Sequence, residues 1–247
     1  MNEKSAYSDQ TSQDYYDEFA QVYDQRRGNN VPGGYHDLLD DLETGYVERF
    51  GTSKDALEVG CGTGLIMQRV ERFARSVQGV DLSPGMLSHA KDRGLSVQQA
   101  SATDLPFADH SFDVVYSFKV LAHVPQIDQA LSEMARVTRP GGVILAEFYN
   151  PYSIRGLLRN LGPAKKIGAT KNEADVFTRF DSPKKAKALT PAGCSFDGAR
   201  GVRIVSPAAQ IVDMKGVGRV FYAVETWLAD TPLRAFAGFY IAKYRKH

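Results

Sequence analysis

Short apolar runs alternate with amphipathic stretches between residues 50 and 150 of the chain. Five of the runs are rich in β-branched residues and short enough to be buried strands: 56–60 (ALEVG), 76–81 (SVQGVD), 95–100 (LSVQQA), 112–118 (FDVVYSF) and 142–149 (GVILAEFY). The stretches between them space their apolar residues as a helix does. Strict alternation of strand and helix indicates an α/β fold, in which a parallel sheet has helices on both faces.

Capping residues mark where several helices should begin and end. Ser83 is a candidate N-cap followed by Pro84, and Gly94 is the stop signal of the same helix. The next helix ends at residues 140–142 (PGG) and places five apolar residues on one face: Ile127, Ala130, Leu131, Met134 and Val137. Another helix is expected directly after Gly64, from the spacing of Leu65, Ile66, Val70 and Phe73.

Both ends of the chain carry further elements. Residues 15–27 (YYDEFAQVYDQRR) predict an amphipathic helix with Tyr16 and Tyr23 on the same face. Residues 217–228 predict a helix that faces the core with Val217, Val220, Phe221, Val224, Trp227 and Leu228. Residues 236–246 (FAGFYIAKYRK) predict the final strand.

Three glycines follow the first strand at alternate positions, in the stretch LEVGCGTG from Leu57 to Gly64. Gly60, Gly62 and Gly64 would form the turn into the next helix, where a missing Cβ permits positive φ and lets a ligand approach the backbone closely. Amide groups at a helix N-terminus favour a polar or anionic end of such a ligand. A tight turn that binds nothing is the alternative for this stretch alone.

Asp81 ends the second strand and follows Gly60 by 21 residues. An acid at this position can accept both hydroxyls of a ribose that lies across the glycine turn. A dinucleotide fingerprint would require glycine at position 65, where the chain has Leu65. The spacing therefore disfavours a nicotinamide cofactor without excluding other nucleosides.

Four motifs in order resemble those of the class I S-adenosylmethionine-dependent methyltransferases. LEVGCGTG is similar to their first motif, and 79–87 (GVDLSPGML), 100–118 (ASATDLPFADHSFDVVYSF) and 120–148 (VLAHVPQIDQALSEMARVTRPGGVILAEF) to the following ones. The resemblance implies a Rossmann-like sheet of seven strands, mostly parallel, with an antiparallel last strand. Within the family, the pattern looks closest to the small-molecule enzymes that include the ubiquinone and menaquinone methyltransferases.

The resemblance implies a cofactor site for S-adenosylmethionine, which leaves as S-adenosylhomocysteine. Gly60, Gly62 and Gly64 would carry the methionine and ribose parts, with Cys61 in the same loop, and Glu58 would organise the loop and the cofactor's ammonium. Asp81 would bind the ribose hydroxyls, and Asp104 with the Thr103 amide would bind the adenine, Asp104 at its amino group. The flanking residues would be Leu82 and Met86 at the ring and Phe118 beside the cofactor.

Methyl transfer from a sulfonium needs mainly an aligned nucleophile, and neither a metal nor a covalent nucleophile is expected. His123 could act as a base, or it could be structural. Tyr16 and Tyr23 resemble family tyrosines that cover the cofactor, one of them near its carboxylate or methyl end; the alternative is a helix that simply packs on the domain. Lys119 is expected to be solvated rather than to bind an anionic substrate.

The charge distribution suggests how the single domain of residues 1–247 is organised. Residues 1–50 carry 11 acids against 4 bases and would form a helical lid, before a cofactor-binding core over 51–149. Residues 150–195 would be a basic insertion that caps the substrate, and 196–247 the last helix and strands. The bases could bind a carboxylate, a phosphate or a membrane surface, or be a solvated face; they include Arg155, Arg159, Lys165, Lys166, Arg179, Lys184 and Lys185.

The overall composition excludes several classes of protein. A net charge of +1 gives no reason to expect nucleic acid as a partner, and two cysteines are too few for a disulfide framework. With no secretory pattern and no apolar run of ~18 residues, a cytoplasmic protein without an integral membrane segment is expected, as a monomer or homodimer.

We therefore expect methyl transfer to a small-molecule acceptor, on oxygen, nitrogen or carbon. The alternatives are a catalytically silent cofactor-binding module that acts through a partner and, less well supported, a nicotinamide-dependent oxidoreductase.

Overall fold

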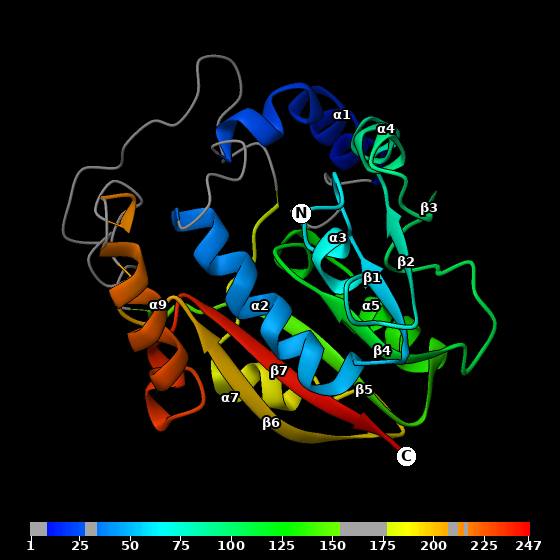
Figure 1. The fold of residues 1–247 in the computed structure, drawn as a ribbon. Coiled ribbons are helices and arrows are strands. Elements are labelled where there is room, and N and C mark those ends of the chain that lie inside the picture. Colours follow the sequence, from blue (N-terminus) through cyan, green and yellow to red (C-terminus); the bar gives the residue numbers. More distant parts are fainter. Residues whose placement is uncertain (1–8, 28–33, 154–176, 207–211, 215–216) are drawn as a thin grey trace, which may run out of the picture.

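The structure is a computed structural model that describes residues 9–27, 34–153, 177–206, 212–214 and 217–247 (Figure 1). Its strands are β1 (Asp55–Val59), β2 (Ser76–Asp81), β3 (Val97–Gln99), β4 (Phe112–Ser117), β5 (Thr138–Tyr149), β6 (Cys194–Val202) and β7 (Phe239–Lys246). The α-helices are α1 (Asp9–Arg26), α2 (Tyr35–Gly51), α3 (Met67–Val70), α4 (Pro84–Asp92), α5 (Ile127–Val137), α7 (Pro183–Ala188) and α9 (Val217–Leu228). Short 3₁₀ turns are η3 (Leu121–His123) and η5 (Pro232–Phe236).

The strands form one seven-stranded sheet in the order β3-β2-β1-β4-β5-β7-β6. Strands β1 to β5 pair in parallel, and β7 is antiparallel to both of its neighbours. The α/β, Rossmann-like sheet of seven strands with an antiparallel last strand is therefore confirmed. Because strand order reverses at β1, the carboxyl ends of β1, β2 and β4 meet where such sheets bind ligands.

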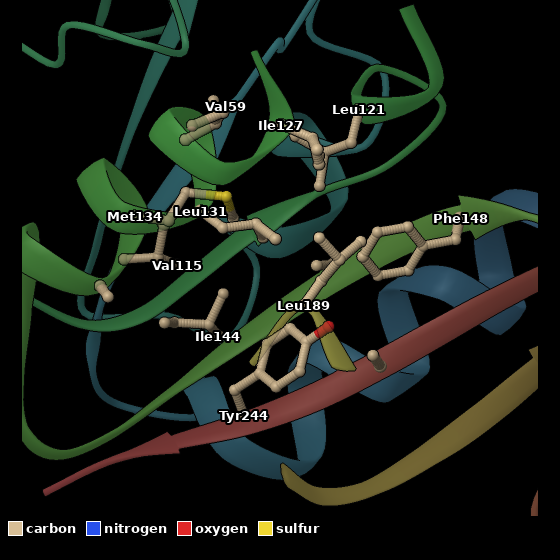
Figure 2. Packing of buried hydrophobic residues seen from close by; sticks show 14 of the residues in the cluster. Val59, Val115, Leu121, Ile127, Leu131, Met134, Ile144, Phe148, Leu189 and Tyr244 are labelled. Carbon is tan, nitrogen blue, oxygen red and sulfur yellow. The ribbon is translucent and has the colours of Figure 1, made fainter. Parts of the chain in front are cut away.

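Side chains of successive strand residues point to opposite faces, and each face carries its own apolar core. On one face, Val115 and Ile144 pack with α5 and α7; Figure 2 shows Leu131, Met134, Leu189 and Tyr244 in this core. On the other, Val114 and Leu145 pack with α2 and α3. Helices thus cover both faces, as predicted, and each core excludes water from one side of the sheet.

The helix signals of the sequence are confirmed at α4 and fail in extent after Gly64. At α5 the predicted face is buried, but the predicted end at 140–142 is wrong, because α5 ends at Val137 and β5 begins at Thr138. The Ser83 hydroxyl accepts a hydrogen bond from the Met86 amide at 3.0 Å, Pro84 lies in the first turn, and Gly94 has φ +79°. The expected helix from Leu65 is wrong in extent, because α3 is a single turn bounded by irregular turns. Leu65, Ile66 and Val70 are nevertheless buried and Phe73 is partly buried, since this segment packs against α2.

Helix α9 exists as predicted, but its orientation is not the predicted one. Val220 is 63% and Trp227 74% exposed, whereas Glu225 is fully buried. The reason is that the Glu225 carboxylate accepts backbone N–H groups of Ile204, Val205 and Ser206 at 2.7 to 2.8 Å. The helix turns its acid inward and so fixes the loop that follows β6.

Residues 154–176 of the predicted basic insertion lie outside the described residues, and these include Arg155, Arg159, Lys165 and Lys166. Of the described bases, Lys184 and Lys185 are exposed on α7. The Arg179 guanidinium pairs with the Asp181 carboxylate at 2.7 Å. No helix in the part of the chain that the structure describes has the length and apolar character to span a membrane.

Candidate functional site

A cavity of about 530 Å³ lies over the carboxyl ends of the parallel strands. This volume is typical of a site for a small molecule. Every long strand contributes to its wall at this edge: Gly60 follows β1, Asp81 ends β2, Phe118 follows β4, Tyr149 ends β5, Arg203 follows β6 and Phe239 begins β7. The start of β7 reaches the same edge because that strand runs antiparallel.

The three glycines of the turn all have positive φ, at +80°, +53° and +84° for Gly60, Gly62 and Gly64. A Cβ on Gly60 would lie 2.3 Å from the side chain of Val120, and one on Gly64 would lie 2.2 Å from Leu95. A Cβ on Gly62 would meet nothing within 4 Å. Packing therefore explains Gly60 and Gly64, and Gly62 is the position where the cavity itself comes up to the backbone.

This difference predicts separable effects of two alanine substitutions. Gly60→Ala should lower the free energy of unfolding by about 2 to 3 kcal/mol, because Val120 is stiff and close and the left-handed φ is retained. Gly62→Ala should lower it by only about 1 kcal/mol, from backbone strain alone. Urea unfolding measures both. Equal losses of unfolding free energy in the two variants would contradict the packing difference. If Gly62→Ala binds a nucleoside ligand as tightly as the wild type does, the ligand does not contact the glycine turn.

Asp81 connects the end of β2 to the glycine turn. One carboxylate oxygen accepts the Gly62 amide at 2.8 Å and the other accepts the Ser83 amide at 2.9 Å. Burial raises the pKa of Asp81 above its ordinary value, against the pull of these amides. The carboxylate lines the cavity and keeps lone pairs for donors that enter it.

Glu58 and Cys61 lie at the base of the turn. Glu58 is 3% exposed and accepts a hydrogen bond from the Tyr116 hydroxyl at 3.2 Å. Burial raises the pKa of Glu58 well above its ordinary value and also raises that of the Cys61 thiol. Both residues line the cavity. The Cys61 sulfur packs against Gly79 of β2, so closely that a Cβ on Gly79 would lie only 2.9 Å from it.

The wall on the β3 side differs in part from the predicted set. Leu82 and Met86 line the cavity as the resemblance implies, and so does a small-residue stretch over 100–102. Gly64, Thr103 and Asp104 are not part of the wall. Asp104 is exposed in the turn that its amide closes on the Ser101 carbonyl at 3.1 Å.

Helix α1 brings Tyr16 and Tyr23 together in the roof of the cavity. Two aspartates of the same helix hold it in place. Asp17 accepts the Gly85 amide at 2.8 Å at the start of α4, and Asp24 accepts the Thr63 hydroxyl at 2.9 Å in the glycine turn. The sequence reasoning missed both anchors, although they lie one and eight residues after Tyr16.

His123 also lines the cavity, at the end of η3. Its Nδ1 lies 2.9 Å from the Phe177 carbonyl oxygen. Because a carbonyl only accepts, Nδ1 of the neutral ring carries the proton, and Nε2 is the basic nitrogen. Its ring is 6.3 Å from that of Tyr16 and 5.7 Å from that of Tyr149.

Lys119 is not solvated, which corrects the sequence-based expectation. Its ammonium lies 2.7 Å from Glu43 and 3.3 Å from Asp40, and both acids are fully buried. Its amide donates to Glu147 at 2.9 Å. Burial opposes the charge of Lys119, but these acids outweigh it and raise the ammonium pKa. Lys119 thereby fixes the loop after β4 to α2. Arg27, at the end of α1, pairs with the same Asp40.

The far end of the cavity contains residues that the sequence analysis did not identify: Arg27, Tyr35, His36, Leu39, Tyr149, Arg203 and Phe239. Tyr149 and Phe239 could have been found from their positions at strand ends that share one sheet edge. The others come from α1, α2 and the loop after β6, which pattern alone does not place near the glycine turn. Among the described residues, no cluster of histidine, cysteine and acidic side chains could hold a metal ion.

Residues 57–146 match a protein family described as a methyltransferase domain. A 27-O-demethylrifamycin SV methyltransferase of Amycolatopsis mediterranei is 30% identical over 176 residues, which are 62% of this chain and 64% of that protein. A demethylmenaquinone methyltransferase of Tropheryma whipplei is 38% identical over 103 residues, 40% and 43% of the two chains. The chain thus matches less than two thirds of the length of either relative.

The fold is shared with solved structures over almost the whole chain. One, described as an S-adenosylmethionine-dependent methyltransferase and possible histamine N-methyltransferase, comes from Thermotoga maritima. It superposes with a TM-score of 0.63, covers 95% of this chain and 99% of that one, and is 19% identical. At this identity the similarity establishes the fold alone.

Proposed function

Since the chain belongs to the class I S-adenosylmethionine-dependent methyltransferases, we propose that it transfers a methyl group from this cofactor to a small-molecule acceptor. The observation that carries the proposal is the juxtaposition of Gly62 and Asp81 at the switch point of the sheet. There the backbone faces the cavity, and the half-buried carboxylate of Asp81 borders it.

The residues present fit the cofactor. The two carboxylate oxygens of Asp81 match a ribose diol in number, and the open space above Gly62 admits a ligand that a Cβ would obstruct. Leu82 and Met86 would flank the adenine, and Phe118 would lie beside the cofactor. Thr103 and Asp104 lie outside the cavity wall, so a contact of theirs with the adenine amino group would require the 101–104 turn to move. Glu58 would face the amino acid part, between Cys61 and Tyr23.

The cofactor would supply a sulfonium-activated methyl group. The chain's own residues then bind and orient the acceptor in a closed space, which is the main requirement of the reaction. We assign to His123 Nε2 the removal of a proton from an acceptor hydroxyl or amine, and to the Tyr23 hydroxyl the positioning of the reacting groups. His123 is suited to this role because the Phe177 carbonyl fixes its tautomer.

A parallel calorimetric titration with S-adenosylmethionine, S-adenosylhomocysteine and NAD tests the cofactor. Micromolar affinity for the first two and none for NAD supports the proposal; affinity for NAD alone overturns it. Labelled methyl transfer to a pool of phenols, quinols and amines then separates an enzyme from a silent binding module. The pool begins with quinols because one of the relatives is named for demethylmenaquinone.

We further propose that α1 is a lid over the cofactor, within an N-terminal segment of residues 1–50. Tyr16 and Tyr23 face the cavity, and Asp17 and Asp24 connect the helix to α4 and the glycine turn. Cofactor added to the protein should slow amide exchange over residues 10–27 at least tenfold, because the bound ligand stabilises the closed helix. Exchange that is identical with and without cofactor would make α1 a packing helix. Exchange over α5 serves as the control.

A further inference from the structure

The wall of the cavity is electrically asymmetric. The acids among its described lining residues are Glu58 and Asp81, which belong to β1 and β2. The basic side chains come from the end of α1, from α2 and from the segments after β4 and β6: Arg27, His36, Lys119, His123 and Arg203. Arg203 lies over the Tyr35 ring, and Arg27 faces the neighbouring His36, so these three basic residues share the part of the wall near Tyr35. A cavity end of one charge sign favours ligands of the other sign.

The acids that balance part of this charge lie behind the wall. Asp40 and Glu43 contact Arg27 and Lys119. Neither acid lines the cavity, and both are fully buried. The ion pairs hold two cationic side chains in fixed positions and leave no described carboxylate on the cavity surface at this end.

Arg203 is the basic residue farthest along the sheet. Its guanidinium lies over the Tyr35 ring at 5.3 Å, and its φ of +65° is unusual for a residue with a Cβ. The Glu225 carboxylate accepts hydrogen bonds from the three backbone amides that follow Arg203 in the chain. A strained backbone held by such contacts is typical of functional positions, and here it presents an arginine to the cavity.

His36 lies next to Tyr35 in the same wall. Charged groups face it from α1, from the loop after β4, from its own helix and from the segment after β6: Arg27, Lys119, Asp40 and Asp213. Burial, then Arg27 and Lys119, lower the pKa of His36 below its ordinary value. An anion bound beside it would reverse the effect of the two cations.

Arg203 lies far along the sheet from the expected ribose position. Asp81 ends β2 and Arg203 follows β6, five strands further along the sheet. At about 4.8 Å per strand, these two points are roughly 24 Å apart. The bonds between the ribose and the carboxylate of S-adenosylmethionine are each about 1.5 Å long and together span less than about 9 Å. The side chains of Arg203 and Asp81 and a hydrogen bond at each end shorten the remaining gap, so the test below includes a decarboxylated cofactor to identify the anion that Arg203 binds.

We propose that Arg203 and His36, with Arg27, bind an acidic group of the methyl acceptor, remote from the atom that is methylated. The acceptor's body would lie among Tyr35, Tyr149 and Phe239, whose last two rings are 5.3 Å apart. The substrate class is thus an aromatic acid whose carboxylate or ionised hydroxyl pairs with the guanidinium of Arg203. This inference rests on the proposed function, because it assumes that the other end of the cavity takes the cofactor.

The test uses the full chain saturated with S-adenosylhomocysteine and three pairs of probes: benzoate and benzamide, salicylate and salicylamide, and 2-naphthoate and 2-naphthamide. In calorimetry, at least one acid should bind at least tenfold more tightly than its amide. Arg203→Gln should abolish that preference and leave the affinity for S-adenosylhomocysteine unchanged. Arg49→Gln is the matched control, since Arg49 also lies over a tyrosine, Tyr46 at 5.8 Å, but outside the cavity wall.

Two results would overturn the inference. One is that every acid binds like its amide, or that the preference survives in Arg203→Gln. The other is that Arg203→Gln weakens S-adenosylmethionine but not its decarboxylated analogue, which would make the bound anion the cofactor's own carboxylate. If the wild-type protein does not bind S-adenosylhomocysteine at all, the result contradicts the proposed function instead. The first titration shows this independently of Arg203.

Discussion

Lys119→Met should lower the free energy of unfolding by about 3 to 5 kcal/mol at neutral pH, the loss typical of removing one partner from a buried ion pair. Lys119 lies 2.7 Å from Glu43 and 3.3 Å from Asp40, and neither acid has any exposed surface. Without the ammonium, Glu43 loses the cation that pairs with it, and Asp40 keeps Arg27 but loses its second cation, in a medium that disfavours charge. Methionine fills similar volume, so the loss reports charge rather than a cavity. Urea unfolding of both proteins measures it.

The loss should shrink as the pH falls. Burial raises the pKa of Glu43, and raises that of Glu147 well above its ordinary value. For an acid whose pKa is higher in the folded protein, the folded state binds the extra proton, so stability rises as the pH falls toward the unfolded value near 4.3. Removal of Lys119 raises these values further, and the difference between variant and wild type should be smaller at pH 5.5 than at pH 7.5. A loss that is independent of pH would contradict the electrostatic explanation.

Lys54→Met provides the control for this comparison. Lys54 is exposed, and surface charges contribute about 0 to 1 kcal/mol. If the two methionine variants unfold at the same urea concentration, the ion pairs beneath the cavity contribute nothing to stability.

Asp81→Ala should weaken binding of S-adenosylhomocysteine at least a hundredfold. Each hydrogen bond to a charged group contributes about 1.5 to 3 kcal/mol, and a ribose diol would donate two of them, while tenfold in affinity is 1.4 kcal/mol. The substitution also frees the Gly62 and Ser83 amides that the carboxylate now holds. Calorimetry measures the affinity.

The matched control is Asp92→Ala, because Asp92 is an exposed acid at the end of α4. It should bind the ligand as the wild type does. An Asp81→Ala protein that unfolds at the wild-type temperature and keeps its affinity would contradict the assignment of Asp81 to the ribose.

The fold and the cofactor end of the cavity were largely predictable from the sequence. Strand and helix periodicity are local properties, so β2 was expected over 76–81 and is observed at Ser76–Asp81. The capping of α4 by Ser83 is equally local, and the glycine turn with Asp81 follows from spacing along two consecutive strands. The first strand was placed within one residue. Strand β3 proved shorter than expected, and the Leu95 amide, predicted to be in the strand, instead donates a hydrogen bond to the Ala90 carbonyl of α4 at 3.2 Å.

The predictions that failed depended on partners distant in the chain. Amphipathic spacing showed that residues 217–228 form a helix, but not that Glu225 would turn inward to bind three amides after β6. Lys119 has the sequence neighbourhood of a solvated loop, yet acids of α2, more than 70 residues earlier, surround it. The hydrophobic pattern of a sequence does not show which buried polar groups will form ion pairs or hydrogen bonds with each other.

The sequence by itself determined the order of strands and helices, the glycine turn and the acid that faces it, because each depends on residues within one β-α-β unit. Tertiary structure alone decided which face of α9 is buried, where Asp17 and Asp24 anchor α1, and that Arg27, His36 and Arg203 meet at one end of the cavity. These residues come from separate elements that only the folded chain brings together. The physical reason is that desolvated charges must be paired, and the pairing is set by contacts in space rather than by period along the chain.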